Sequence, residues 1–167
     1  MQSAECLRRV RPLVRERVPA ELREFQWESY SFQSKLWYGN KALHYEVWPR
    51  EKLGTIEIGL HFEADPLTNA RLLAAFAANA KAIRRALAGA RIEEWDRGWA
   101  RVWEPLPHRK PDAGLASELA ERIAAYVIAL EPILRRELPS DVAWTEPETR
   151  PARVRAGGKS RTTSAAR

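Results

Sequence analysis

The sequence predicts an α+β domain, in which helices pack on one face of an antiparallel sheet of about four strands, in the order α-ββ-α-ββ-α. Residues 43–48 and 56–63 alternate apolar and polar side chains, as strands do, on either side of a short turn. Residues 91–106 form a second hairpin around an Asp-Arg-Gly turn. After each hairpin, residues 66–87 and 113–134 carry an apolar stripe at helical spacing.

The chain begins with a predicted helical segment, residues 1–20 of a single domain that we expect to span residues 1–138. Its apolar side chains recur at helical spacing: Leu7, Val10, Val14 and Val18. Ser3 is the expected N-cap. Pro12 removes a backbone donor, so the helix either kinks there or a second helix begins there. Residues 24–32 then alternate weakly and predict an edge strand.

The first hairpin has a polar face opposite its apolar one, as expected of a sheet covered on one side. This polar set comprises His44, Glu46, Glu57, His61 and Glu63. A four-residue turn at Glu51–Gly54 would place His44 opposite His61, with Glu46 beside them. A two-residue turn would instead place Glu46 opposite Glu57, so the register decides which groups meet.

Histidines and carboxylates on paired strands can bind a metal ion or divide general acid and base roles. We therefore take His44, Glu46, Glu57 and His61 as a candidate metal site, although no H-E-x-x-H spacing accompanies them. Equally, a strand that faces solvent is polar without any function.

The later helices have recognisable ends. Asp65 and Pro66 predict the N-cap and first residue of one helix, and Gly89 predicts its left-handed end. Residues 105–114 are too rich in proline for regular structure, and Asp112 caps a long final helix. Pro132 predicts a kink or an early end of that helix.

A second candidate surface is aromatic, because the chain has seven tryptophans. In a regular second hairpin, one face would hold Trp95, Arg97, Trp99, Arg101 and Trp103. Such a stripe can stack unpaired bases while its guanidinium groups reach phosphates, and Trp48 would extend it if the hairpins lie side by side. The alternative is that these tryptophans belong to the core or to a partner interface, with arginine stems packed on them.

The net charge of +6 belongs to the chain ends. Residues 21–138 have 17 basic and 17 acidic side chains, and residues 150–167 have six basic and no acidic ones. Residues 139–167 predict a disordered basic tail, because they have too little apolar surface to offset the entropy of ordering. The residues of this tail that would contact phosphates are Arg150, Arg153, Arg155, Lys159 and Arg161.

The single cysteine, Cys6, excludes an intramolecular disulfide and any cysteine-based zinc site. No apolar run is long enough to cross a membrane, and the first residues lack the apolar core of a signal peptide. We therefore expect a cytoplasmic protein with no membrane partner.

Residues 43–134 carry HYEVW, IEIGLHFEAD, an Ala/Leu helix, EEWDRGWARVWEPL and a final helix with a late proline. This order resembles small bacterial α/β domains of uncharacterised function, some of which are attached to restriction-endonuclease-like nuclease domains. The resemblance implies a role near DNA transactions or phage defence and supplies no functional residues. The first aspartate is Asp65, so we expect any nuclease to be a separate protein.

The leading hypothesis is a non-enzymatic binding or accessory module without a cofactor, whose partner is nucleic acid or a nucleic-acid enzyme. The alternatives are a metal-assisted hydrolase that uses the His/Glu cluster, and a structural protein that dimerises through exposed tryptophans.

Overall fold

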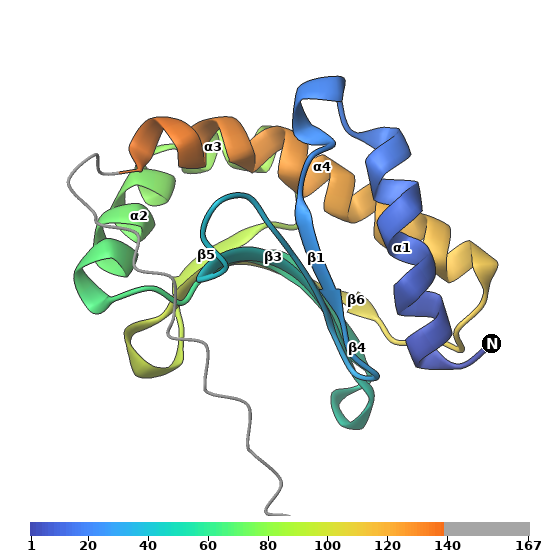
Figure 1. Ribbon diagram of the computed structural model, residues 1–167. Coiled ribbons are helices and arrows are strands. Elements are labelled where there is room, and N and C mark those ends of the chain that lie inside the picture. Colours follow the sequence, from blue (N-terminus) through green and yellow to red (C-terminus); the bar gives the residue numbers. More distant parts are fainter. Residues whose placement is uncertain (139–167) are drawn as a thin grey trace, which may run out of the picture.

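The computed structural model describes residues 1–138, so the predicted disordered tail and its phosphate contacts lie outside the described residues. Within the described part, six strands form one antiparallel sheet, and four helices cover one of its faces (Figure 1). The predicted α+β class is confirmed, but the sheet has two strands more than the four expected.

The helices are α1 (Ser3–Arg17), α2 (Pro66–Ala78), α3 (Ala80–Ala86) and α4 (Ala113–Glu137). The strands are β1 (Gln26–Ser29), β2 (Ser34–Trp37), β3 (Leu43–Arg50), β4 (Thr55–Phe62), β5 (Arg91–Glu94) and β6 (Ala100–Pro107). Short 3₁₀ turns lie at η1 (Ala20–Leu22), η2 (Glu51–Leu53) and η3 (Asp96–Gly98). The strand order is β1-β2-β3-β4-β6-β5, so β6 lies between β4 and β5.

The two additional strands lie at one edge of the sheet. β1 falls within the predicted edge strand at 24–32, whereas β2 was not expected. Its four residues are too few for a recognisable alternation. It pairs with the outer side of β3, where Lys35 lies opposite Glu46. Pairing with β3 therefore stabilises β2 as a strand, although the residues of β2 show no clear strand pattern in the sequence.

Two helical predictions differ in detail from the structure. α1 is one helix that continues through Pro12, with Gln2 rather than Ser3 at its N-cap. The helix expected at residues 66–87 divides at Asn79, whose side-chain amide donates a hydrogen bond to the Ala75 carbonyl, 2.8 Å away. A polar side chain that bonds its own backbone in this way competes with helix continuation. The cap at Asp65 is confirmed, since this side chain accepts from the Thr68 backbone N–H at 3.0 Å.

Two predictions about glycine and proline were wrong, and a third is narrowed to one of its alternatives. Gly89 is not left-handed but lies against Glu104, where an added Cβ would come within 2.4 Å of a carboxylate oxygen. Pro105 and Pro107 belong to β6 instead of an irregular linker. β5 pairs only with the first half of β6, so the outer edge of β6 has no neighbouring strand at these prolines, and no backbone donor is needed there. Pro132 lies inside α4, which continues to Glu137, so the early end is excluded and the kink stays a prediction.

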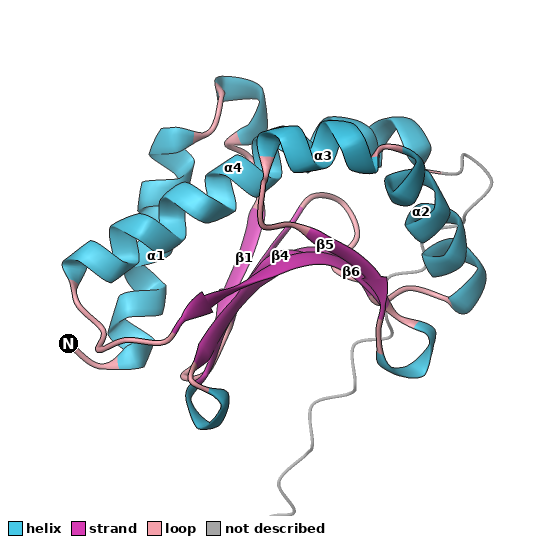
Figure 2. Cartoon of the chain, turned by 180° about the vertical axis from the view of Figure 1, so that it is seen from behind, coloured by secondary structure: helices cyan, strands magenta, loops and turns pink. Residues whose placement is uncertain are grey.

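Apolar side chains of β3, β4 and β6 face the helices and form the core with α4 and α1, as the sequence predicts. The sheet arches, and all four helices lie on its convex side (Figure 2). Among the described residues, no helix is both long and apolar enough to cross a bilayer.

Candidate metal centre on the concave face of the sheet

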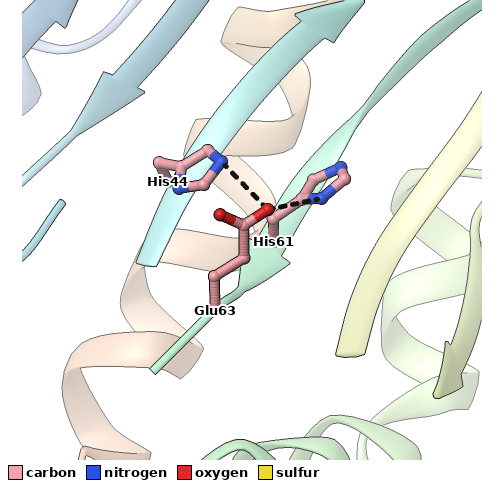
Figure 3. A group of neighbouring side chains, drawn as sticks. All are labelled: His44, His61 and Glu63. Carbon is pink, nitrogen blue, oxygen red and sulfur yellow. Dashed lines mark ion pairs between the residues drawn. The ribbon is translucent and has the colours of Figure 1, made fainter. Parts of the chain in front are cut away.

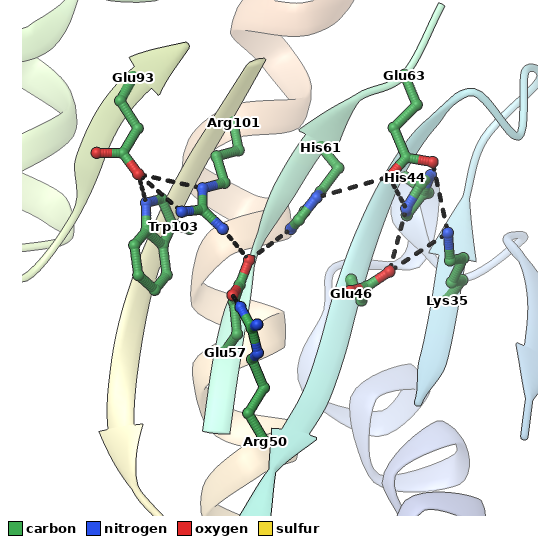
Figure 4. A network of polar contacts seen from close by, with 10 residues as sticks. All are labelled: Lys35, His44, Glu46, Arg50, Glu57, His61, Glu63, Glu93, Arg101 and Trp103. Carbon is green, nitrogen blue, oxygen red and sulfur yellow. Dashed lines mark hydrogen bonds and ion pairs between the residues drawn. The ribbon is translucent and has the colours of Figure 1, made fainter. Parts of the chain in front are cut away.

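The sheet face turned away from the helices is concave and lined by polar and aromatic side chains. We call it the concave face. Its central residues are Lys35, His44, Glu46, Glu57, His61, Glu63, Arg101 and Trp103. None of the four described helices covers this face, yet the side chains of His44 and His61 are only 1% and 0% exposed. The two rings are packed against each other and against Trp95, and carboxylates lie beside them (Figure 4).

The turn between β3 and β4 sets which side chains meet. It occupies Glu51–Gly54, where Gly54 has a left-handed φ of 65°. His44 therefore pairs with His61, as the four-residue alternative predicted. The two rings stack with centroids 5.6 Å apart and an interplanar angle of 11°. Figure 3 shows Glu63 reaching toward both rings from beyond the end of β4.

One ring nitrogen of His44 is committed to the backbone. Its Nδ1 lies 2.8 Å from the Lys41 carbonyl oxygen. A carbonyl only accepts, so Nδ1 carries a proton, and Nε2 is the nitrogen of this ring that a metal ion could bind once it carries no proton. That nitrogen lies 3.4 Å from Glu46 Oε2 and 3.9 Å from Glu63 Oε1. His44 is therefore oriented with a ligating atom toward two carboxylates.

His61 is oriented in the complementary way. Its Nδ1 lies 3.9 Å from Glu63 Oε1, and its Nε2 lies 3.5 Å from Glu57 Oε1. Burial lowers the pKa of His61 to about 3, so the ring is neutral at pH 7 and offers a lone pair. With Nδ1 bound to a metal, the Nε2 proton would face the Glu57 carboxylate. Hydrogen bonds of this kind to the remote nitrogen typically orient metal-binding histidines.

Three buried ring nitrogens have no hydrogen-bond partner among the described residues: His44 Nε2, His61 Nδ1 and His61 Nε2. Buried polar atoms are almost always paired, because an unsatisfied one costs about 1–3 kcal/mol. Two of these atoms point toward the same carboxylate, that of Glu63. A cation between them would satisfy both.

One ligand atom each of His44, His61 and Glu63 lies within 4.8 Å of the others. Ligand atoms around a tetrahedral zinc ion lie about 3.3 Å apart, so small side-chain movements would let the three share one ion. The structure thus brings both predicted histidines together. Glu63, which the sequence placed on the polar face but not in the metal set, is the third candidate ligand.

The other two predicted ligands take different positions. Glu46 is next to His44 and adjoins the candidate site. Burial alone would raise the pKa of Glu46, but the contact with His44 and the positive charge of Lys35 help to lower it to about 2. Glu57 lies on the far side of His61, between Arg101 and Arg50. Its pKa is raised because burial outweighs the attraction of Arg101. Glu57 can therefore orient His61 rather than bind the ion.

Lys35 is the residue of this cluster that sequence reasoning missed. Its ammonium lies 3.3 Å from Glu46 Oε2 and 3.6 Å from Glu63 Oε2, and its side chain is 15% exposed. The signal was weak because β2 itself was not predicted. Only the pairing of β2 with β3 brings Lys35 beside the two carboxylates.

The predicted tryptophan–arginine stripe forms only in part, because the turn Asp96–Gly98 interrupts it. Arg97 lies in that turn with a left-handed φ of 60° and an exposed side chain. Trp99 contacts Trp95, with ring centroids 5.7 Å apart. The five residues therefore do not share one regular face.

Arg101 lies over the rings of Trp95 and Trp103, with its Cζ 4.9 Å and 3.9 Å from their centroids. It also donates hydrogen bonds to Glu57 and Glu93 (Figure 4). Its guanidinium group is thus used within the protein, as the structural alternative for this stripe anticipated.

Within residues 1–138, Trp48 does not extend this group directly. Trp48 lies on β3, which β4 separates from β6. The guanidinium of Arg50 lies over its ring. All six described tryptophans are half-buried. Dimerisation through exposed tryptophans stays a prediction.

No family model, curated protein or solved structure matches this chain. The resemblance to nuclease-associated bacterial domains stays a prediction, and function has to be argued from the geometry of the site.

Proposed function

We propose that this protein is a non-enzymatic domain that binds one divalent transition-metal ion on its concave face. His44 Nε2, His61 Nδ1 and a Glu63 oxygen would be the ligands, with Glu46 beside them as a fourth. The observation that carries the proposal is the pair of buried ring nitrogens, His44 Nε2 and His61 Nδ1, which make no hydrogen bond with the described residues and both lie 3.9 Å from the same Glu63 oxygen. Imidazole and carboxylate ligands together suit Zn²⁺ best among common ions.

Burial favours binding over catalysis. Catalytic zinc sites keep an open position for water or substrate. Here both histidines are 1% exposed or less, and only Glu63 and Lys35, at 19% and 15%, reach the rim. The metal-assisted hydrolase remains an alternative that would need a water-accessible position on the ion.

The test is titration of the full, chelator-treated chain with ZnCl₂, followed by calorimetry and thermal unfolding. We expect one ion per chain. Zinc at about 100 times Kd should stabilise the fold by about 2.7 kcal/mol, which raises Tm by several degrees. His44→Ala and His61→Ala should each remove most of this effect, because each deletes a ligand.

His108→Ala is the matched control. This third histidine follows β6, and its backbone N–H donates to the Gly54 carbonyl at the opposite end of β4 from His61. Its replacement should leave zinc binding unchanged. The proposal fails if the wild-type chain binds no zinc, or if the His44 and His61 variants bind it as tightly as the wild type.

Contact with a polyanion such as nucleic acid is a second candidate function, and one observation outside the concave face favours it. An open hollow of about 460 Å³ between α1 and η1 is lined by three arginines and one acidic side chain, together with Pro12: Arg11, Arg15, Arg23 and Glu16. The Nε of Arg15 donates to the Arg23 carbonyl, and the Nε of Arg23 donates to the Val18 carbonyl. These bonds hold the two arginines through Nε, and a phosphate could accept hydrogen bonds from their terminal nitrogens.

A further inference from the structure

The candidate metal site already contains a positive charge. The ammonium of Lys35 lies between Glu46 and Glu63, 3.3 Å and 3.6 Å from their Oε2 atoms. Glu63 therefore presents one oxygen to the two histidines and the other to Lys35. In the metal-free protein, Lys35 compensates two carboxylates that are packed close together in a largely buried place.

It would cost much free energy to hold a divalent ion between the histidines and Glu63 while the Lys35 ammonium keeps its position beside the same carboxylates. Like charges within a few ångströms repel strongly where the surroundings are partly desolvated. The ion would also be bound by oxygen lone pairs of Glu63 and Glu46, the two carboxylates with which Lys35 forms ion pairs in the metal-free protein. Metal binding should therefore displace Lys35.

The sheet offers Lys35 a second partner. On the same face, Lys35 pairs with Glu46 of β3 on one side and with Glu28 of β1 on the other. Glu28 is 38% exposed and lies at the edge of the sheet. Its contacts with Lys41 and Tyr30 both use Oε2. A lysine side chain can move from the inner carboxylates to Glu28 by rotating about its own bonds, without any change in the backbone.

We propose that Lys35 is a built-in competitor for the metal ion. It holds Glu46 and Glu63 in the metal-free protein and moves outward to Glu28 when the ion binds. This inference rests on the proposed metal-binding function. Its consequence is that the domain stays folded without metal, and that metal occupancy changes the charge pattern along the edge of β1 and β2.

Calorimetric titration with zinc tests the competition. Lys35→Met keeps the length of the side chain and removes its charge, so we expect Kd to tighten at least tenfold. Lys35→Arg keeps the charge and should stay within about threefold of the wild type. Circular dichroism of the metal-free variants checks that each is folded, and Lys35→Gln is the substitute if Lys35→Met is not.

A second variant tests the outward position. Glu28→Gln should weaken zinc binding several-fold in the wild-type chain, because displaced Lys35 loses its acceptor. In the Lys35→Met background the same change should have no effect. This non-additivity is a signature that a merely structural role of Glu28 would not give.

The wild-type protein gives an independent measurement. Acetylation of Lys35 by an amine-reactive reagent, followed by mass spectrometry, should become at least fivefold faster when zinc is added. Lys52, exposed in the turn after β3, is the internal control and should react at a constant rate.

The outcomes separate the two proposals. If neither the wild type nor Lys35→Met binds zinc, the proposed function itself is overturned. If both bind with equal affinity, or if Lys35→Met binds more weakly, the metal site stands and the competitor role of Lys35 is overturned.

Discussion

His61 lies in an environment that differs strongly from that of a free side chain. It is completely buried, it stacks on His44, and Trp95 meets its ring edge-on at 5.4 Å between centroids. Its pKa is lowered from 6.5 to about 3, chiefly by burial. The unfolded chain therefore takes up a proton near pH 6.5 that the folded protein accepts only near pH 3.

This difference predicts the acid sensitivity of the metal-free protein. Above pH 6.5, protonation of His61 does not affect the free energy of unfolding. As the pH falls from 6.5 toward 3, only the unfolded chain takes up this proton, so the free energy of unfolding decreases, by at most about 1.4 kcal/mol per pH unit. In His61→Gln, denaturant unfolding at a series of pH values should show a shallower decline between pH 6.5 and 4.5. His108→Gln should keep the wild-type decline. An unchanged slope in His61→Gln would contradict the prediction.

At the scale of the element, α4 covers the convex side of the sheet and depends on its N-cap. The side chain of Asp112 accepts a hydrogen bond from the Leu115 backbone N–H at 2.7 Å. Asp112→Ala should lower the free energy of unfolding by about 1 kcal/mol, because it leaves an unpaired donor in the first turn. Asp96→Ala is the control, since Asp96 makes only an ion pair with exposed Arg97 and should cost little. Urea denaturation measures both, and equal losses would refute the cap's role.

At the scale of the whole molecule, the excess positive charge lies at the two ends of the chain: in residues 1–20, which include the packed helix α1, and in residues 150–167. A polyanion should therefore bind through counterion release, with a Kd that weakens steeply as salt is added. Replacing Arg150, Arg153, Arg155, Lys159 and Arg161 by Gln should reduce the slope of log K against log salt, by about 0.9 for each phosphate of duplex DNA that is no longer neutralised. Arg11→Gln with Arg23→Gln should reduce it further if the hollow beside α1 contributes.

Fluorescence anisotropy with labelled single- and double-stranded DNA measures these slopes. Arg84→Gln with Arg85→Gln, on the surface of α3, is the control and should leave them unchanged. If the wild-type chain binds neither form of DNA even at low salt, the nucleic-acid hypothesis is refuted.

The sequence by itself determined the local features of this protein. Period-two alternation predicted β3, β4 and the second hairpin, and Asp65 and Asp112 predicted two caps, because these signals depend on neighbours a few residues away. It also predicted the polar face and the pairing of His44 with His61 for a four-residue turn. These contacts cross a single hairpin, so turn length alone decides them.

Only the tertiary structure decided the composition of the candidate site. β2 has almost no local signal, so the place of Lys35 depends on its pairing with β3. β6 pairs with β4, and this pairing places Arg101 in contact with Glu57. Glu63, at the end of β4, is then the carboxylate that His61 Nδ1 faces. The centre of a face predicted to be solvated is buried, because side chains from four strands pack together there. This burial depends on side chains from strands that lie far apart in the sequence, so no short stretch of the sequence could predict it.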